Sequence, residues 1–402
     1  APNLAYRTGS FAATGIPLMN GQADYLNMLN ARDGGIGGIK INSEECETGY
    51  STEKGVECYE KTKAKAIVTQ PWSTGITLQV LPKTNVDEIP ILAPGYGFSP
   101  MADGKVFQWA FNTPSGYWDA ASMILQYLQG QGDLNGKKIA FLHLDHPYGK
   151  EPLPLLEKKA GEMGFELVPI PVGLKEMQNQ SAQWLQIRRE RPDYVVMWGW
   201  GAMNAGAITE AVKTKFPMEN FIGIWWSGSE NDVLPAGEGA NGYKALTFHN
   251  VGSDYPVFDD IQQYVVDAGK AAGAGDQIGT ALYNRGLYAA MLAAEAAKTA
   301  QEMHGTSTLT PQQMRDGMEN LEITEAKMTD LGLPGFGPEF SVSCQNHGGD
   351  GYAAVAQWDA AAGEWSLITD YMQADLDVLS PLIEEDSAAF AAEAGIEPGC
   401  AM

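Results

Sequence analysis

A chain of 402 residues is too long for one compact core, so we expect two domains. Its 50 acidic and 26 basic residues give a formal net charge of −24, which argues against nucleic acids and anionic membrane surfaces as partners because both attract basic patches. No apolar run approaches the roughly 20 residues that cross a bilayer, and no signal peptide is visible, so Ala1-Pro2 is compatible with the mature end of an exported protein.

The first part of the chain alternates predicted strands and helices. Residues 3–8 form a predicted strand, followed by the loop GSFAATG and a helix that begins at Pro17 and ends at Gly34-Gly35. Residues 39–41 are the predicted second strand. The fourth, residues 90–95, ends in the loop GYGFSP. This alternation is typical of βαβ units in a parallel sheet.

The third strand, residues 66–70, ends at a turn with the composition of a binding site. An apolar run gives way to Gln70-Pro71 and then to Trp72-Ser73-Thr74-Gly75, after which a helix can begin. In open α/β sheets, ligands bind beyond the carboxyl ends of the strands. Hydroxyl groups and free N–H groups at a helix start suit a carboxylate or another small polar group.

After Trp118 the same alternation begins again, which predicts a second parallel sheet. The next predicted elements are a helix at 119–128, a strand at 139–144, a helix at 153–163, and strands at 165–169, 194–198, 221–226 and 245–251. A long Ala-rich helix at 277–301 follows them. The last predicted elements are a β-hairpin of 340–344 and 352–358 around HGGDG, a strand at 365–368, and an acidic helical tail that ends at Gly395.

Four cysteines, Cys46, Cys58, Cys344 and Cys400, form one local group near each end of the chain. An even count in such groups predicts two disulfides, Cys46 with Cys58 and Cys344 with Cys400, and an oxidising compartment. The alternative is four buried thiols in a cytosolic protein. The spacing offers no zinc site, because there is no CxxC pair or Cys/His cluster.

Signatures of catalysis are absent from the sequence. It contains no GxGxxG, GxxxxGK[ST], HExxH or GxSxG motif and only five histidines. His143, Asp145 and His146 at one strand end are conceivable as a metal or acid–base group, but a pocket wall is the preferred interpretation because no third ligand is indicated. HGGDG is interpreted as a tight turn rather than a calcium loop, because its glycines already explain a turn.

Aromatic side chains gather at the predicted strand ends: Trp72, Tyr96, Tyr148, Trp198, Trp200, Trp225 and Trp226. Any one of these rings can simply fill the core. As a set they predict a shared aromatic-walled pocket, because binding clefts combine apolar walls with a few polar groups.

At these same residues the chain resembles the type I periplasmic solute-binding proteins, in the branched-chain amino-acid binding family of ABC importers. The resemblance spans nearly the whole chain and rests on the order of LNARDGGIGG, the cysteine after strand two, QPWSTG, APGYGFSP, HLDHPYG, YVVMWGWG and the closing HGGDG with its QWD. It implies an α/β fold of two similar doubly wound lobes, joined by three crossover strands and closing on a ligand between them. We expect lobe 1 at 1–120 and 248–330, and lobe 2 at 121–247 and 331–402.

The resemblance also implies the ligand-binding residues. In the first lobe these are Ser73, Thr74, Tyr96 and Gly97, with Thr14 where the amino-acid binders carry a tyrosine. In the second lobe they are Tyr148, Trp200 and an acid, of which Glu230 is nearest, preceded by Trp225. Trp72 completes the expected aromatic wall.

We therefore expect a periplasmic, monomeric binding protein that delivers a small amphipathic carboxylate to the membrane permease of an ABC importer, without a cofactor, a metal or catalysis. The other functions considered are a ligand-sensing receptor domain of the same fold and an enzyme on a doubly wound fold. Three classes of ligand stay as alternatives: an amino acid, a quaternary ammonium compound and an aromatic carboxylate.

Overall fold

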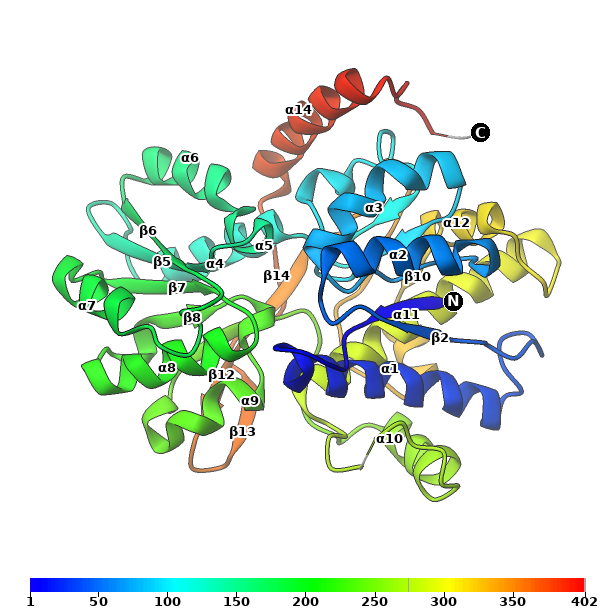
Figure 1. Cartoon of the computed structure of the whole chain (residues 1–402), viewed down its shortest axis with the longest axis horizontal. Coiled ribbons are helices and arrows are strands. Elements are labelled where there is room, and N and C mark those ends of the chain that lie inside the picture. The colour runs from blue at the N-terminus through cyan, green and yellow to red at the C-terminus, as the bar shows by residue number, and fades with distance from the viewer. Residues whose placement is uncertain (274, 401–402) are drawn as a thin grey trace. The chain divides into compact units, whose positions relative to one another are not determined.

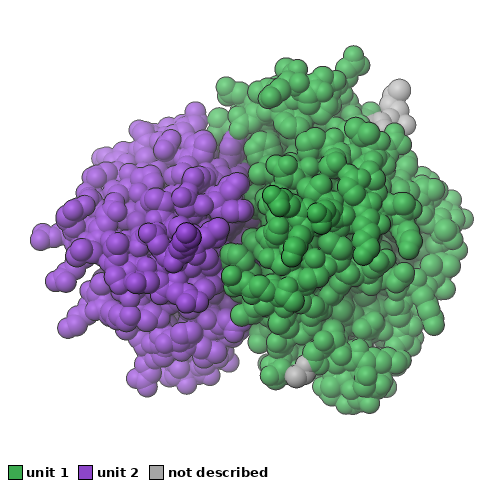
Figure 2. Space-filling model, in the orientation of Figure 1, with its two compact units in different colours: residues 1–116, 252–352, 376–402 green, residues 117–251, 353–375 purple. Residues whose placement is uncertain are grey.

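A computed structural model describes residues 1–273 and 275–400, which divide into two compact units (Figure 2). Unit 1 comprises residues 1–116, 252–352 and 376–402, and unit 2 comprises residues 117–251 and 353–375. The expected boundaries near residues 120 and 248 lie within a few residues of these. Residues 331–352 and 376–402 belong to unit 1, however, whereas the sequence assigned them to the second lobe. The chain crosses between the units at 116–117, 251–252 and 352–353. A fourth crossing, at 375–376, returns the tail to unit 1.

The sheet of unit 1 is built from short parallel strands. Strand β1 (Pro2–Ala5) pairs with β2 (Glu44–Glu47), and β3 (Ile91–Leu92) pairs with β4 (Ala110–Phe111). Two isolated bridges, Asn3 with Gln70 and Thr69 with Ile91, join these pairs. The third predicted strand is therefore present as residues that bridge β1 to β3.

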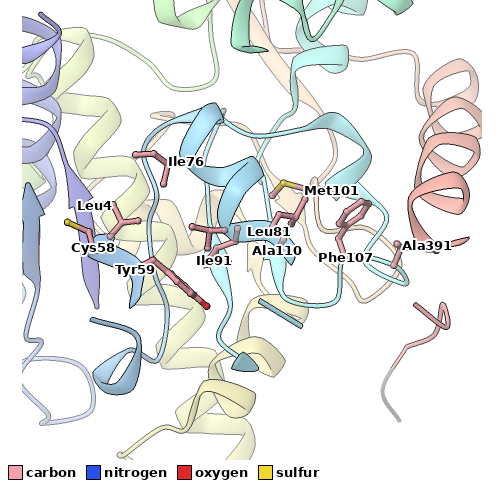
Figure 3. Close-up of a cluster of buried hydrophobic side chains, with 12 residues drawn as sticks. Leu4, Cys58, Tyr59, Ile76, Leu81, Ile91, Met101, Phe107, Ala110 and Ala391 are labelled. Atoms are coloured by element: carbon pink, nitrogen blue, oxygen red, sulfur yellow. The ribbon is translucent and has the colours of Figure 1, made fainter. Parts of the chain in front are cut away.

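Helices cover the unit 1 sheet (Figure 1). Helix α1 (Ala12–Arg32) packs against α11 (Ala281–His304), and α11 packs against α12 (Pro311–Glu319). Helices α2 (Thr52–Thr62) and α3 (Thr74–Asp87) pack on each other. Figure 3 shows the apolar cluster beneath them, which includes Leu4 and Ile91 from the strands and Ile76 and Leu81 from α3. Burying these side chains is the main source of stability for the unit.

The remaining elements of unit 1 come from its later segments. They are α10 (Pro256–Ile261) with the π-helical turn Gln262–Val266, β10 (Glu322–Ile323), α13 (Glu325–Asp330), β11 (Phe340–Ser341) and α14 (Leu376–Ala394). Both predicted disulfides are present in this unit, Cys46 with Cys58 and Cys344 with Cys400, each with Cα atoms 5.7 Å apart. The second disulfide therefore ties the tail to unit 1.

Three predictions about unit 1 are wrong. The second strand is β2, not residues 39–41, and Cys46 lies within it. Helix α1 begins at Ala12, so Pro17 lies inside it. Residues around HGGDG form no hairpin, because β11 pairs with β10 while the strand after the turn pairs elsewhere. For the two strand predictions, pairing with distant residues decided the outcome.

Unit 2 contains one continuous mixed sheet. Its parallel strands are β5 (Lys138–Leu144), β6 (Glu166–Val172), β7 (Tyr194–Trp198), β8 (Phe221–Gly223) and β9 (Lys244–Thr247). Antiparallel strands β12 (Tyr352–Asp359) and β13 (Glu364–Leu367) extend it in the order β13-β12-β9-β8-β7-β5-β6, and β14 (Met372–Gln373) pairs with β12. The buried β-branched and aromatic runs of β5 and β7 explain why the sequence located them correctly.

The helices of unit 2 are α4 (Tyr117–Gln131), α5 (Pro147–Lys150), α6 (Leu153–Met163), α7 (Ser181–Glu190), α8 (Ala202–Thr214) and α9 (Glu230–Val233). Since β5, β7, β8 and β9 run parallel, their carboxyl ends meet at one edge of the sheet. Across the described part of the chain, no helix combines the length and the apolar character needed to span a bilayer.

Candidate functional site

The turn after residue 70 begins helix α3 in unit 1. Ser73 has an extended backbone and is the N-cap of the helix, and its Oγ accepts from the Ile76 backbone N–H at 3.5 Å. The first N–H groups of a helix have no partner within it. The first turn of α3 also carries no acidic side chain. This end of the helix can therefore stabilise an anion through its N–H groups and its dipole.

Aromatic side chains surround this turn. Trp72 is 1% exposed, has a positive φ of 41°, and its Nε1 donates to Asn3 Oδ1 at 2.7 Å. Its ring lies edge-on to Tyr96, with centroids 5.9 Å apart, and the Tyr96 hydroxyl contacts the Tyr6 hydroxyl at 3.1 Å. Tyr50 hydrogen-bonds to the Ser73 side chain. Its buried position raises the pKa of the Tyr50 phenol above the usual value, so the phenol is neutral.

Two other residues expected at the first-lobe site have local structural roles. The Thr14 hydroxyl donates to the Phe11 carbonyl oxygen at 2.7 Å, in the first turn of α1. Gly97 has a positive φ of 100°, and a Cβ there would lie 3.2 Å from the Met101 sulfur. Glycine is therefore required by the backbone at this position. Thr74 is buried at the first position of α3.

Sequence reasoning missed three aromatic residues of this region. Tyr6 follows β1 and Tyr50 follows β2, while Phe11 lies in the loop GSFAATG. The Tyr50 ring packs against Tyr6 at 4.8 Å and Phe11 at 4.5 Å. The rule that selected Trp72 and Tyr96, an aromatic residue just past a strand, missed Tyr6 because the first strand was predicted to continue to residue 8, whereas β1 ends at Ala5. It missed Tyr50 because the second strand was placed five residues too early.

In unit 2, Tyr117 at the start of α4 lies at the centre of an aromatic cluster. Its ring centroid is 5.4 Å from Tyr148, 6.1 Å from Trp198 and 6.3 Å from Trp225, to which it is nearly parallel. Trp225 also packs edge-on against Phe248 at 5.2 Å. The structure thus brings the predicted Tyr148 and Trp225 together through a residue that the sequence did not single out.

The backbone just past β7 is fixed by hydrogen bonds from neighbouring strand ends. Tyr148 donates its hydroxyl to the Gly199 carbonyl oxygen at 2.9 Å. Ser227 Oγ donates to the same carbonyl at 3.0 Å and accepts from the Gly199 N–H at 3.2 Å. Trp200 is 2% exposed and packs edge-on against Trp226 at 5.2 Å. The aromatic residues predicted in unit 2 are therefore held at defined positions.

Two acids lie near the end of β8. Glu230 begins α9 and is half-buried. Asp232 is 2% exposed, accepts from the Ser229 N–H at 2.9 Å and from Asn204 at 3.1 Å, and closes the capping box of α9. Burial raises the pKa of the Asp232 carboxyl to about 7. Asp232 therefore stabilises the loop, while the role expected for Glu230 stays a prediction.

The histidines considered as a catalytic or metal group occupy separate environments. His143 is buried, its Nδ1 contacts the Leu144 carbonyl oxygen at 3.1 Å, and burial lowers the pKa of its imidazole. Asp145 pairs with Lys150, and His146 accepts from the Tyr148 N–H as the cap of α5. Among the residues that the structure describes, no three His, Cys, Asp or Glu side chains are grouped to hold a metal.

His347, from the HGGDG segment, packs inside unit 1. Its ring stacks on Phe111 with centroids 3.8 Å apart, and its Nδ1 lies 3.0 Å from the Ala110 carbonyl oxygen. Its Nε2 lies 3.3 Å from Glu319, which also pairs with Arg315 at 2.9 Å. Burial pushes the pKa of Glu319 upward, but these two partners hold it below its usual value. This segment is therefore a packing element of the core.

The two units offer different chemistry at their strand ends. Unit 1 presents a capped helix start and hydroxyl groups, whereas unit 2 presents tryptophan and tyrosine rings whose polar groups are partly committed to the backbone. Apolar walls combined with a few polar groups are typical of sites that bind small molecules.

Comparison with known proteins supports this interpretation. The model of the periplasmic binding protein family matches residues 2–364. A protein described as an ABC transporter permease from the Pseudomonas fluorescens group is 39% identical, covers 100% of this chain and 99% of its own, and has a TM-score of 0.91. No curated protein sequence matches.

Two more distant structures share the fold. A branched-chain amino-acid ABC transporter protein from Thermus thermophilus, with bound valine, is 18% identical over 96% of this chain and 97% of its own, with a TM-score of 0.77. An R. palustris solute-binding protein in complex with benzoate is 16% identical over 91% and 94%, with a TM-score of 0.69. The α/β fold, the family match and the strand-end sites agree: this chain belongs to the periplasmic binding protein family, whose members bind their ligands and catalyse no reaction.

Proposed function

We propose that this protein is the solute-binding component of an ABC importer and binds a small amphipathic carboxylate, an amino acid or a relative of one. The observation that carries the proposal is the contrast between the Ser73-capped start of α3 in unit 1 and the rings around Tyr117 in unit 2. One half of the site suits a carboxylate and the other an apolar body.

The polar half of the proposed site selects against multiply charged anions. Residues 70–77 and 93–100 contain no lysine or arginine. A carboxylate requires only the Ser73 hydroxyl, the Thr74 region and backbone N–H groups, while phosphate is usually held by basic side chains as well. Arg7, just past β1, is paired with Glu45 at 2.5 Å.

The other end of the ligand determines its class. An amino acid needs a partner for its ammonium group, for which we propose Glu230. A quaternary ammonium compound needs only ring faces, each worth about 0.5–2 kcal/mol, and an aromatic carboxylate stacks on the same rings. Proteins of the same fold bind valine in one case and benzoate in another. We place the amino acid first because Glu230 is half-buried and lies close to Trp225 and Trp226 in the chain.

In this proposal the ligand shifts the population toward the state to which it binds most tightly, and the permease recognises that state. The protein acts as a monomer outside the cytoplasm. Size-exclusion chromatography with light scattering, in the presence and absence of ligand, tests the monomer. Native mass spectrometry of the purified protein, before and after denaturation and refolding, would identify a small molecule that co-purifies.

Titrations by isothermal calorimetry test the ligand class. Valine, glycine betaine and benzoate are titrated into the wild type, Ser73→Ala, Trp200→Ala and Glu230→Gln, with Ser181→Ala as an exposed-serine control. Ser73→Ala should weaken every carboxylate about 10- to 100-fold, the scale of a charge-assisted hydrogen bond. Glu230→Gln should weaken valine alone. Trp200→Ala should cost about 1 kcal/mol or more as a buried aromatic anchor.

The proposal is wrong in its ligand class if none of the three compounds binds the wild type. It is wrong about the site if Ser73→Ala and Trp200→Ala bind as tightly as Ser181→Ala does. Loss of benzoate binding together with valine binding in Glu230→Gln would show that the acid acts on the fold of the site rather than on an ammonium group.

A further inference from the structure

A cavity lies within unit 1, apart from the residues assigned to the ligand. It has a volume of about 290 Å³ and is lined mainly by apolar side chains, which come from α1, α11, α12, the bridging strand residues and the segments 36–42 and 307–309. Its floor includes Leu26, Val68, Ala294, Ala297 and Met314, all buried. Trp72, Ser73 and Tyr96 do not line it. The alanines of α11 leave the space that larger side chains would fill.

One buried polar group in the wall of this cavity has no partner. Gln70 is 3% exposed and lines the cavity, and its Nε2 makes no hydrogen bond with any described residue. An unmet buried donor costs roughly 1–3 kcal/mol, so such groups usually mark a bound water, ion or ligand.

A chain of side-chain amides determines whether the unpaired atom of Gln70 is its nitrogen or its oxygen. The Trp72 indole can only donate, so the group facing it must be the Asn3 oxygen, as observed. The Asn3 nitrogen then donates to the Gln22 oxygen, and the Gln22 nitrogen donates to the Gln70 oxygen. The orientation of each amide follows from the one before it. The unpaired end of Gln70 is therefore a donor.

The charge around the cavity restricts its occupant further. The buried residues that line it are apolar or, as with Gln22 and Gln70, neutral amides. The Lys40, Glu44 and Lys65 side chains that line it are exposed, and the half-buried Ala1 ammonium group donates to the Asn42 carbonyl oxygen at 2.8 Å. A buried ion would have no partner of opposite charge at the floor. An apolar body with one acceptor would satisfy both the Gln70 donor and the apolar walls.

We propose that this cavity is a second small-molecule site, for a neutral and largely apolar compound that carries one hydrogen-bond acceptor. Its volume is about twice the roughly 150 Å³ of an engineered apolar cavity that binds benzene, so a substituted single ring fits. The site is independent of the carboxylate site and stands whether or not the proposed transport ligand is correct.

Acetophenone and ethylbenzene are a matched pair of probes, because they have nearly the same shape and only acetophenone carries an acceptor. Their affinities are measured by NMR titration for the wild type, Gln70→Met, Ala294→Leu and Trp200→Ala. Ala31→Leu is the control, since it adds the same atoms at an exposed position of α1. Crystals soaked with acetophenone locate the probe.

We expect acetophenone in the cavity with its oxygen at Gln70 Nε2. Ala294→Leu should abolish this binding, while Ala31→Leu and Trp200→Ala leave it unchanged. Gln70→Met should lower the acetophenone-to-ethylbenzene affinity ratio about 3- to 10-fold, the effect of one neutral hydrogen bond. Because this is a ratio within one variant, a general loss of stability does not imitate it.

Three results would overturn the proposal. Soaked crystals could show only water in the cavity. Acetophenone binding could survive Ala294→Leu and be lost in Trp200→Ala, which would place the probe among the rings of unit 2. An unchanged affinity ratio in Gln70→Met would show that the free amide donor recognises nothing.

Discussion

The two units build and stabilise their sheets in different ways. Unit 1 has short strands, joined in part by isolated bridges, and it contains both disulfides of the described chain. Unit 2 has one continuous sheet whose longest parallel strands have seven residues, and its strand ends are packed with tryptophan. Disulfides reinforce the apolar core of the first, whereas the second relies on a continuous sheet and aromatic packing.

The two units also differ in the groups that lie at their strand ends. In unit 1 the short strands leave turns and a helix start beyond their ends, as at Ser73, the N-cap of α3. In unit 2 the polar groups at the sheet edge largely hold the backbone, as Ser227 and Tyr148 hold Gly199, and rings form the rest. In the proposed function, the polar strand ends of unit 1 suit a carboxylate and the rings of unit 2 suit an apolar body.

The largest expected effect is on the aromatic packing of unit 2. Trp225→Ala removes a fully buried ring that touches Tyr117 and Phe248. We expect it to lower the unfolding free energy by about 3–5 kcal/mol, measured by urea denaturation. Leu185→Ala, at a leucine that is 67% exposed in the same unit, should change it by less than about 0.5 kcal/mol. Similar small losses in both variants would show that the rings do not stabilise this unit.

The disulfides of unit 1 provide the next largest effect. They join residues 12 and 56 positions apart. In the loop-entropy model these links contribute about 3 and about 4 kcal/mol, respectively. We therefore expect the Cys344→Ala/Cys400→Ala variant to lose more stability than the Cys46→Ala/Cys58→Ala variant. Thermal unfolding of both double variants tests this order, and the reverse order would show that native-state contacts outweigh the entropy of the unfolded chain.

The sequence revealed elements that are buried along their own length. The apolar runs of β5 and β7 and the helix of residues 153–163 needed no partner to be recognised, since their periodicity is local. The turn at Trp72 and Ser73 was recognised for the same reason, because a buried run stops there abruptly.

What the sequence did not reveal depends on pairing. Strand β2 reads EECE, is largely exposed, and is a strand only because it pairs with β1. Its true position is what places Tyr50 beside Ser73. The tail belongs to unit 1 because Ser387 donates to Asp103 and Cys400 bonds to Cys344, contacts that no local pattern encodes. The central place of Tyr117 in the aromatic cluster likewise could not be predicted, because the cluster forms only where strand ends that are distant in the sequence come together.

A smaller effect is expected from the one strongly perturbed acid in unit 2. Burial raises the pKa of Asp232 to about 7. The folded state then holds a proton that the unfolded state has released above about pH 4. Stability should therefore fall as the pH rises, by about 2 kcal/mol between pH 5 and pH 7 from this group. Asp232→Asn, which keeps an acceptor for the Ser229 N–H, should remove that part of the pH dependence of urea unfolding. An unchanged slope would show that hydrogen bonds from Ser229 and Asn204 already keep the carboxylate ionised.

The smallest expected effect separates stability from binding in unit 1. Ser73 and Tyr50 are hydrogen-bonded to each other, so a ligand carboxylate must compete with Tyr50 for the Ser73 hydroxyl. Tyr50→Phe removes the competitor but keeps the ring against Tyr6 and Phe11. The unfolding free energy should fall by about 0.5–1.5 kcal/mol, the net value of one hydrogen bond, while a carboxylate should bind about 2- to 10-fold more tightly. Urea denaturation and calorimetry of the same preparation measure both. Opposite signs are the signature of competition, because a purely structural residue would weaken both properties. If affinity falls along with stability, then the Tyr50 hydroxyl itself contacts the ligand, and the polar half of the site is larger than the turn at Ser73.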